Sequence, residues 1–90
     1  MRLDLFLKAS RIVKRRTVAQ EMCEAGRVLV NDHASKQAKE VRQGDRITLL
    51  FSTKSVELEI LDLPASSRQI DPSLLYRVIA EKRVAHENTV

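Results

Sequence analysis

Hydrophobic positions at the start of the chain recur at helical spacing. Leu3, Phe6, Leu7 and Val13 fall on one side of a helical wheel, which predicts an amphipathic helix over residues 3–13. The opposite side of the same wheel is polar and mostly basic. Its residues are spaced three or four apart, so they form one stripe: Asp4, Lys8, Arg11 and Arg15.

A second helix is expected to begin at Thr17. Thr17 and Gln20 have the Thr-x-x-Gln spacing of a capping box, in which the hydroxyl and the amide bond to free backbone N–H groups. Gly26 is well placed to end the helix, because glycine readily takes the left-handed conformation found there. The apolar side of this helix comprises Val18, Ala19, Met22, Cys23 and Ala25.

Beyond Gly26 the helical period gives way to alternation. A short strand is expected at residues 27–30, a turn at Asn31–Asp32 and a return through residues 34–35. A second turn at residues 43–45 precedes two alternating runs, Ile47-Leu49-Phe51 and Val56-Leu58-Ile60 with Glu57 and Glu59 between them. These runs indicate an antiparallel pair with one buried face.

The last quarter of the chain predicts a linker and a final helix. Residues 64–70 are rich in serine and small residues, and Asp71–Pro72 is a good helix start. Leu74, Leu75, Val78 and Ile79 would line one side of that helix, Lys82–Arg83 suit its C-terminal end, and the residues beyond are expected to fray. The predicted fold class is α+β: two N-terminal helices packed on a small antiparallel sheet, with a short C-terminal helix. The domain boundary is placed between residues 1–63 and 64–90.

Length and composition favour one cytoplasmic domain. Ninety residues suffice for one compact domain, and no run approaches the roughly 18 apolar residues of a membrane span. Asp4 interrupts any apolar core of a signal peptide, so export is not expected. A single cysteine, Cys23, cannot form an internal disulfide, as is usual in a reducing compartment.

The positive charge is confined to the first half of the chain. Residues 1–46 hold eleven Lys or Arg and six Asp or Glu, a net of +5, whereas residues 47–90 hold five and six, a net of −1. Concentrated positive charge is typical of a surface that binds a polyanion, either nucleic acid or an anionic membrane. The alternative is a solvated basic surface with no partner.

Residues that could support catalysis or metal binding are few and scattered. One Cys with His33 and His86 gives no zinc-ligand spacing, and Cys23 reads as a small core residue. Two glycines are too few for a phosphate-binding loop. Glu57 and Glu59 share one side of a strand, where a solvated surface is favoured over a catalytic carboxylate pair. No enzyme activity, metal or cofactor is therefore expected.

Several spaced motifs in residues 1–51 carry a more specific signal. In order they are Arg2-Leu3-Asp4-x-Phe6-Leu7, Arg15-Arg16-Thr17-x-Ala19, Gly26-Arg27-Val28-x-Val30-Asn31, Lys36 and Val41-x-x-Gly44-Asp45-x-Ile47. This series resembles the S4 RNA-binding domain, which implies an S4-like (alpha-L) module. Two positions depart from the family pattern: Leu5, where a basic residue is frequent, and Asp32, where glycine often follows the turn asparagine.

An S4 domain with a short, nearly neutral tail looks like the RqcP family and, more distantly, the fifteen-kilodalton heat-shock protein family. The resemblance implies a factor that docks on the large ribosomal subunit, contacting rRNA and peptidyl-tRNA. RqcP proteins assist quality control of stalled nascent chains, supporting C-terminal tail elongation by a partner factor on the same particle. The heat-shock alternative is recycling of stalled large subunits. Either way a cytoplasmic monomer with no membrane partner is expected.

The family pattern assigns the RNA contacts first to Arg2 and Arg16. Lys8, Arg11, Arg15, Arg27 and Lys36 are expected around them. Arg16 and Thr17 lie at the start of the second helix, where free N–H groups and the helix dipole favour a phosphate; the alternative is that Thr17 only caps the helix. Asp4 is expected to cap the first helix or to orient an arginine.

Aromatic residues are too few to stack unpaired bases. They are Phe6, Phe51 and Tyr76, and both phenylalanines fall at core positions, so recognition of folded RNA by shape and phosphates is favoured. Two other readings remain open. One is a DNA-binding helix-turn-helix regulator. The other is a protein-interaction module that uses Leu75, Val78 and Ile79 of the last helix.

Overall fold

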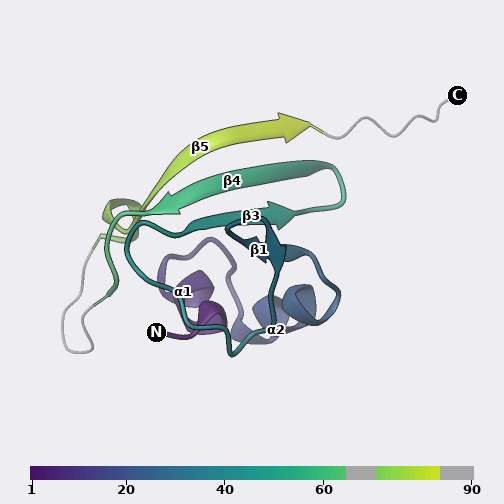
Figure 1. Ribbon diagram of the computed structural model, residues 1–90, viewed down its shortest axis with the longest axis horizontal. Coiled ribbons are helices and arrows are strands. Elements are labelled where there is room, and N and C mark those ends of the chain that lie inside the picture. The colour runs from purple at the N-terminus through teal and green to yellow at the C-terminus, as the bar shows by residue number, and fades with distance from the viewer. Residues whose placement is uncertain (65–70, 84–90) are drawn as a thin grey trace, which may run out of the picture.

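The computed structural model describes residues 1–64 and 71–83 of the chain. Two helices are followed by a sheet, with one short 3-10 turn before the last strand (Figure 1). In chain order the elements are α1 (Leu3–Ala9), α2 (Arg16–Glu24), β1 (Val28–Val30), β2 (His33–Ala34), β3 (Arg46–Leu50), β4 (Lys54–Ile60), η1 (Pro72–Leu74) and β5 (Tyr76–Arg83).

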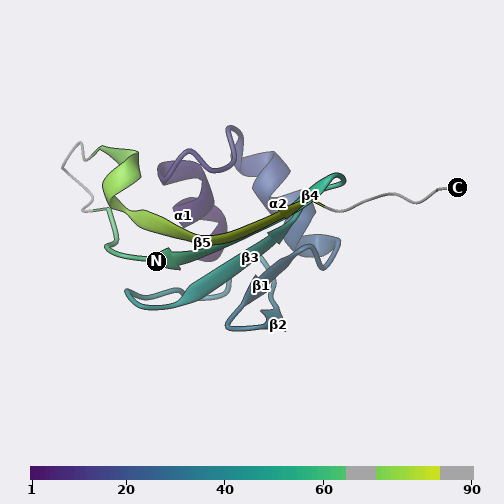
Figure 2. The ribbon, with the colours of Figure 1, turned by 90° about the horizontal axis from the view of Figure 1, so that it is seen from above.

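The five strands form one antiparallel sheet in the order β2-β1-β3-β4-β5. Both helices lie on the same side of this sheet (Figure 2). In this order β1 lies between β2 and β3, so β5 forms one edge of the sheet and β2 the other. The two-layer arrangement buries one face of the sheet and leaves the other in solvent.

The first helix is shorter than the sequence predicts. It ends at Ala9 instead of Val13, because the Ser10 hydroxyl donates to the Phe6 carbonyl (2.7 Å) and the next residue, Arg11, takes a φ of 62°. A hydroxyl that bonds back to the helix competes with the next turn of helical bonding. Val13 is nevertheless buried, so the apolar spacing correctly indicated a buried position but not the length of the helix.

The second helix begins one residue earlier than predicted, and the predicted capping box is wrong. Arg15 is the N-cap and no side chain caps this end. Gln20 does not reach back to the helix start, because its amide donates to the carboxylate of Asp4 on α1 (3.1 Å). The end at Gly26 is confirmed: Gly26 has a φ of 73°, and the Arg27 N–H bonds to the Met22 carbonyl, as in a Schellman motif.

The predicted turn at Asn31–Asp32 is confirmed. Both residues have positive φ, 50° and 71°, which is the geometry of the two-residue turns that match strand twist. The Asn31 side chain also accepts a hydrogen bond from the Arg46 N–H (3.0 Å), which fixes the turn to β3. Asparagine and aspartate tolerate this backbone region, so the missing glycine does not change the turn.

The predicted antiparallel pair is confirmed as β3 and β4. Ile47 lies opposite Leu58 and Leu49 opposite Val56, with their side chains directed toward the helices. The buried core joins both layers and consists of Leu3, Phe6, Leu7, Val13, Ala19, Cys23, Val28, Val30, Val41, Ile47, Leu49, Leu58, Ile60 and Leu75.

The predicted C-terminal helix is wrong. Asp71 accepts a hydrogen bond from the Ser73 N–H (3.0 Å), but it caps only the 3-10 turn η1. The chain then continues as β5, because aromatic and β-branched residues at 76, 78 and 79 favour a strand and β4 offers an open edge. Val78 and Ile79, expected on a helix face, are half exposed on β5, and Lys82–Arg83 end a strand.

The α+β class, with two helices on a small antiparallel sheet, is confirmed. The domain boundary at residue 63 stays a prediction. Most of the predicted linker and the predicted frayed end lie outside the described residues, as does His86.

Leu75 and Leu74 offer a test of this C-terminal structure. Leu75 is 1% exposed and Leu74 62% exposed, although a helix would have placed both on its packed side. Leu75→Ala is expected to lower the free energy of unfolding by about 2–4 kcal/mol, because it leaves a cavity. Leu74→Ala is expected to change it by less than about 0.5 kcal/mol. Urea denaturation measures both, and equal effects would contradict the described packing.

Candidate nucleic-acid interface

A buried carboxylate, Asp4, organises the basic end of the helix layer. Its side chain is fully buried and accepts hydrogen bonds from both helices. Arg2 donates through Nε to Oδ1 (3.2 Å) and through a terminal nitrogen to Oδ2 (3.3 Å). From α2, Arg16 Nε (3.2 Å) and Gln20 Nε2 (3.1 Å) both donate to Oδ2. The Leu5 N–H completes the set at 2.9 Å.

The environment of Asp4 keeps it ionised. Burial acts to raise the pKa of the carboxyl, but the hydrogen bonds from Gln20 and Arg16 and the charges of Arg2 and Arg16 together lower it below its ordinary value. A carboxylate that accepts several charged or amide donors is stabilised in its charged form. The cluster therefore holds one negative charge against two arginines and retains a net positive charge.

Arg2 and Arg16 are held in place while remaining open to solvent. Each side chain is 44% exposed, although each bonds to the buried carboxylate. Arg16 uses only Nε for Asp4, so its two terminal nitrogens can donate to an incoming anion. A guanidinium fixed in this way loses little freedom when it grips a phosphate through two N–H groups. Asp4 orients both arginines, and it also accepts a hydrogen bond from the Leu5 N–H in the first turn of α1.

The backbone around this cluster is anchored by the segment that follows the first hairpin. The N–H groups of Leu3 and Asp4 bond to the carbonyls of Lys39 (2.8 Å) and Gln37 (3.2 Å). These are helix-start groups that would otherwise lack a backbone partner. The segment thus satisfies the start of α1 and fixes the direction in which Arg2 leaves the domain.

The structure brings some of the other predicted contacts together and separates the rest. Lys8 and Arg11 are exposed and line one hollow with Lys14. Arg15 is exposed at the start of α2. Among the described residues, no carboxylate lies within 4 Å of the basic groups of Lys8, Arg11, Lys14 or Arg15, since the ion pairs of this region all involve other cations.

Arg27, Lys36 and Thr17 are placed differently. Lys36 pairs with Glu24 (3.6 Å), and Arg27 approaches the Leu50 carbonyl (3.5 Å) at the end of β3. Thr17 lines a hollow that also contains Glu21 and Glu24. A phosphate at the start of α2 stays a prediction, as do the RNA contacts of all these residues.

Sequence reasoning missed Gln20 and Lys14 as parts of this surface. Gln20 lies four residues after Arg16, so both project from the same side of α2 toward Asp4. The sequence analysis instead pairs Gln20 with Thr17 in a capping box, which the structure does not contain. Lys14 lies within the basic run 14–16. Its role in the hollow depends on the end of α1 at Ala9, which the apolar pattern did not reveal.

Arg11 is held in a backbone conformation that suits glycine. Its φ of 62° follows the end of α1, and its N–H bonds to the Lys8 carbonyl (3.0 Å). The left-handed region costs a residue with a side chain about 1–2 kcal/mol.

Other chemistry finds no support in the described part of the chain. Burial raises the pKa of the Cys23 thiol to about 11, so it is protonated at neutral pH, and its predicted core position is confirmed. Glu57 and Glu59 lie on the solvent side of β4 and pair with Arg46 (3.2 Å) and Arg77 (2.6 Å). Residues 1–64 and 71–83 contain no group of three His, Cys, Asp or Glu able to hold a metal. They also contain no helix long and apolar enough to span a membrane.

Comparisons with known proteins identify the family to which this chain belongs. The S4 domain model matches residues 1–47, which include the whole Asp4 cluster. A protein of Halalkalibacterium halodurans named RQC P-site tRNA stabilizing factor is 42% identical over 94% of this chain and 97% of its own length. Its counterpart in Streptococcus pneumoniae is 38% identical over 93% of this chain and 96% of its own. The chain belongs to the S4 domain family, within its RqcP group.

Solved structures agree with the S4 assignment. The trimeric structure of Vibrio cholerae heat shock protein 15 has a TM-score of 0.76 and 33% identity, and the match covers 89% of this chain and 82% of that one. This identity is lower than that of the two RqcP relatives, as expected from the sequence for the heat-shock family.

Asp4→Asn tests the charge of the cluster in this S4 domain. Because the folded-state pKa of Asp4 is below its ordinary value of 3.8, its contribution to stability is present above about pH 5 and is lost as the pH falls through 3.8 toward the folded pKa. The substitution is expected to lower the free energy of unfolding at pH 7 by about 1–3 kcal/mol. It should also flatten the fall in stability below pH 5. Asp32→Asn, at an exposed carboxylate, is the control, and equal losses from both variants at pH 7 would contradict the assigned role.

Arg11→Gly tests the cost of the left-handed conformation. Glycine takes that conformation freely, so the free energy of unfolding is expected to rise by about 1 kcal/mol. Arg11→Ala removes the same side chain and keeps the unfavourable backbone, so no such rise is expected. Thermal or urea unfolding of both variants measures the difference. A stable Arg11→Ala variant that matches Arg11→Gly would show that the side chain, and not the backbone, is the source of the cost.

Proposed function

We propose that this protein docks on the large ribosomal subunit and stabilises peptidyl-tRNA there, contacting phosphates of rRNA and tRNA. The observation that carries the proposal is the Asp4 cluster, which presents Arg2 and Arg16 as fixed, half-exposed donors. The names of its RqcP relatives support tRNA as a ligand and the P site as the place where it is bound. The S4 match supplies RNA as the class of ligand.

The mode of recognition is electrostatic. Lys and Arg neutralise phosphates and release counterions, which gives affinity with little dependence on base sequence. Phe6 is buried, and Phe51 and Tyr76 are packed against the core, so these side chains do not form an exposed stacking platform. Specificity in this proposal comes from two RNAs held in fixed relation on one particle, rRNA and tRNA, and not from reading bases.

The finer parts of the proposal concern partners and setting. The protein acts as a non-enzymatic, monomeric factor in the cytoplasm. It assists quality control of stalled chains and supports a partner factor that elongates their C-terminal tails. Its contribution is positional, because a tRNA held against rRNA keeps the stalled chain available for extension.

A second candidate function is recycling of stalled large subunits, as proposed for the heat-shock type. The structural similarity to heat shock protein 15 favours it. The two functions differ in what happens after binding. If the stalled nascent chains on large subunits gain C-terminal tails in the presence of the protein, the first candidate is supported. Release of peptidyl-tRNA without tail addition supports the second.

Arg16→Ala tests the proposed RNA contact. The variant is expected to bind large subunits carrying peptidyl-tRNA about tenfold or more weakly, since hydrogen bonds to charged groups contribute about 1.5–3 kcal/mol. Co-sedimentation with purified particles measures binding, and a melting curve checks that the domain stays folded. Arg77→Ala removes an exposed arginine from the other face of the sheet and serves as the matched control. Unchanged co-sedimentation of a folded Arg16→Ala variant would remove the cluster from the interface.

A further inference from the structure

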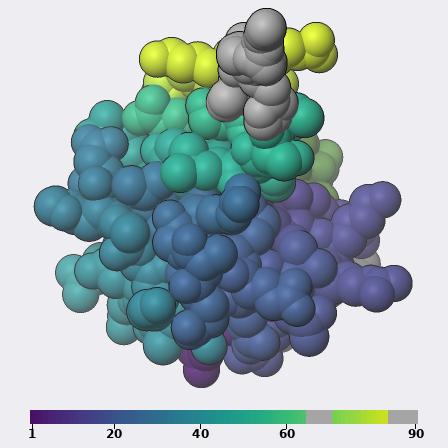
Figure 3. All heavy atoms as spheres, turned by 90° about the vertical axis from the view of Figure 1, so that its right-hand side faces the viewer, coloured from purple at the N-terminus to yellow at the C-terminus, as the bar shows by residue number. Residues whose placement is uncertain are grey.

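A groove continues from the helix layer onto the end of the sheet. Its wall is Arg11 and Ile12, and its floor is the helix-facing side of β4 and β5, including Val56 and Val78. Lys54 and Glu81 also line it. Figure 3 shows this end of the molecule, with the purple segment after α1 below the green start of β4 and the yellow end of β5.

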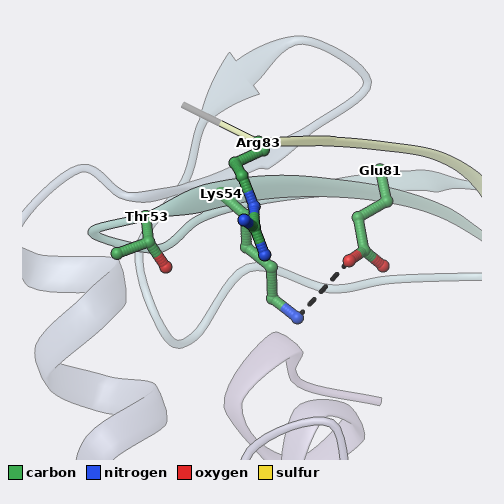
Figure 4. A pocket seen from close by; sticks show the side chains of 4 residues that line it. All are labelled: Thr53, Lys54, Glu81 and Arg83. Carbon is green, nitrogen blue, oxygen red and sulfur yellow. Dashed lines mark ion pairs between the residues drawn. The ribbon is translucent and has the colours of Figure 1, made fainter. Parts of the chain in front are cut away.

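The end of the β4–β5 pair carries a second hollow. It is lined by Thr53, Lys54, Glu81 and Arg83, which Figure 4 shows projecting from neighbouring strands. Lys54 lies opposite Arg83 in the antiparallel register and pairs with Glu81 (3.6 Å). No described carboxylate lies within 4 Å of the Arg83 guanidinium. Like charges placed opposite each other on a sheet repel, and Glu81 supplies one negative charge against these two cations.

The three adjoining hollows are strongly positive. Arg11 lines both the groove and the hollow of Lys8 and Lys14, and Lys54 lines both the groove and the hollow of Arg83, so the three form one track, here called the cationic track. Among the described residues that line it, five are basic and only Glu81 is acidic, a net of +4. The five are Lys8, Arg11, Lys14, Lys54 and Arg83.

We propose that the cationic track binds a second stretch of RNA backbone, with Lys54 and Arg83 contacting its phosphates. The proposal rests on the proposed function and extends it to residues that the S4 match, ending at residue 47, does not include. Arg11, held at a glycine-type position between the two ends of the track, joins them.

Continuity favours RNA over an acidic protein segment as the occupant. Lys8 lies one helical turn after Asp4, so the track begins beside the arginines of the Asp4 cluster. From there it runs past Arg11 to Lys54 and Arg83. A row of cations along a surface suits a nucleic-acid backbone, which carries one negatively charged phosphate in every nucleotide. The apolar floor of the groove suits ribose and base edges that lie between such phosphates.

The test compares two double variants that remove the same charge from one strand pair. Lys54→Gln with Arg83→Gln alters the cationic track. Arg77→Gln with Lys82→Gln alters the opposite face of the sheet. The register pairs Arg77 with Glu59 and Lys82 with Ser55, both on the solvent side of β4, and an irregularity between Glu57 and Leu58 shifts the alternation along β5. Binding of the labelled full chain to large ribosomal subunits carrying peptidyl-tRNA is measured from 50 to 300 mM KCl.

The track variant is expected to bind at least tenfold more weakly at 100 mM KCl. The magnitude of the slope of log affinity against log salt should fall by about 1.4–1.8, since each of the two phosphate contacts contributes about 0.7–0.9. The control variant is expected to keep the slope of the unaltered protein. Equal slopes for the two variants would overturn the proposal, and equal melting temperatures would exclude misfolding as the cause.

Failure of this inference is distinguishable from failure of the proposed function. If Arg16→Ala weakens binding but the track variant does not, the Asp4 cluster contacts RNA and the track does not. If the unaltered protein fails to bind the particle, the proposed function itself is wrong. A photo-crosslinking residue at Thr53 identifies the occupant: a crosslink to RNA supports the proposal, and a crosslink to protein alone overturns it.

Discussion

The structure depends on one buried ionised carboxylate. Asp4 lies on α1, yet three of its four donor residues lie outside that helix: Arg2 before it, and Arg16 and Gln20 on α2. A buried charge with partial pairing would be strongly unfavourable, so the two helices are constrained to the one arrangement that supplies every donor. Packing alone allows helices to slide, whereas hydrogen bonds between named atoms do not. The same bonds that align the helices also set the direction of two arginines, which makes the fold and the proposed RNA contact a single requirement.

Charge is distributed so that the two faces of the sheet have different properties. On the solvent face, Arg46 and Arg77 form ion pairs with Glu57 and Glu59. On the side of the helices, Lys8, Arg11 and Lys14 have no acidic partner among the described residues. Unpaired cations repel one another, so their concentration on one side slightly lowers the stability of the folded domain when no partner is bound. A polyanion that binds this side relieves the repulsion, and binding should therefore stabilise the domain.

Sequence reasoning located most of the fold and less of its detail. Alternation found β3 and β4, and the Asn31–Asp32 turn was found because those residues tolerate positive φ. The predicted end of α1 was wrong because Val13 is buried although it lies beyond the helix. A periodic apolar pattern does not distinguish a buried helical residue from a buried loop residue. The C-terminal helix failed for a non-local reason: the edge of β4 was open, and pairing with it outweighed a helix start that Asp71 supplies only to one 3-10 turn. Motif order pointed to Arg2 and Arg16, but only the tertiary structure could show that one carboxylate holds both.

The packing of Phe6, Phe51 and Tyr76 into or against the core has a consequence for how such a domain can be selective. Phosphate contacts of this kind are weak in specificity, and any folded RNA offers them. Selectivity then has to come from the relative position of several contacts, each modest in itself. Two contact areas on one rigid domain act together when their ligands are held on the same particle, because the second contact forms at a high effective concentration. A free RNA that satisfies only one area gains no such advantage. The rigidity that Asp4 imposes on the helix pair is therefore what would let a small basic domain distinguish an assembled particle from its separate RNAs.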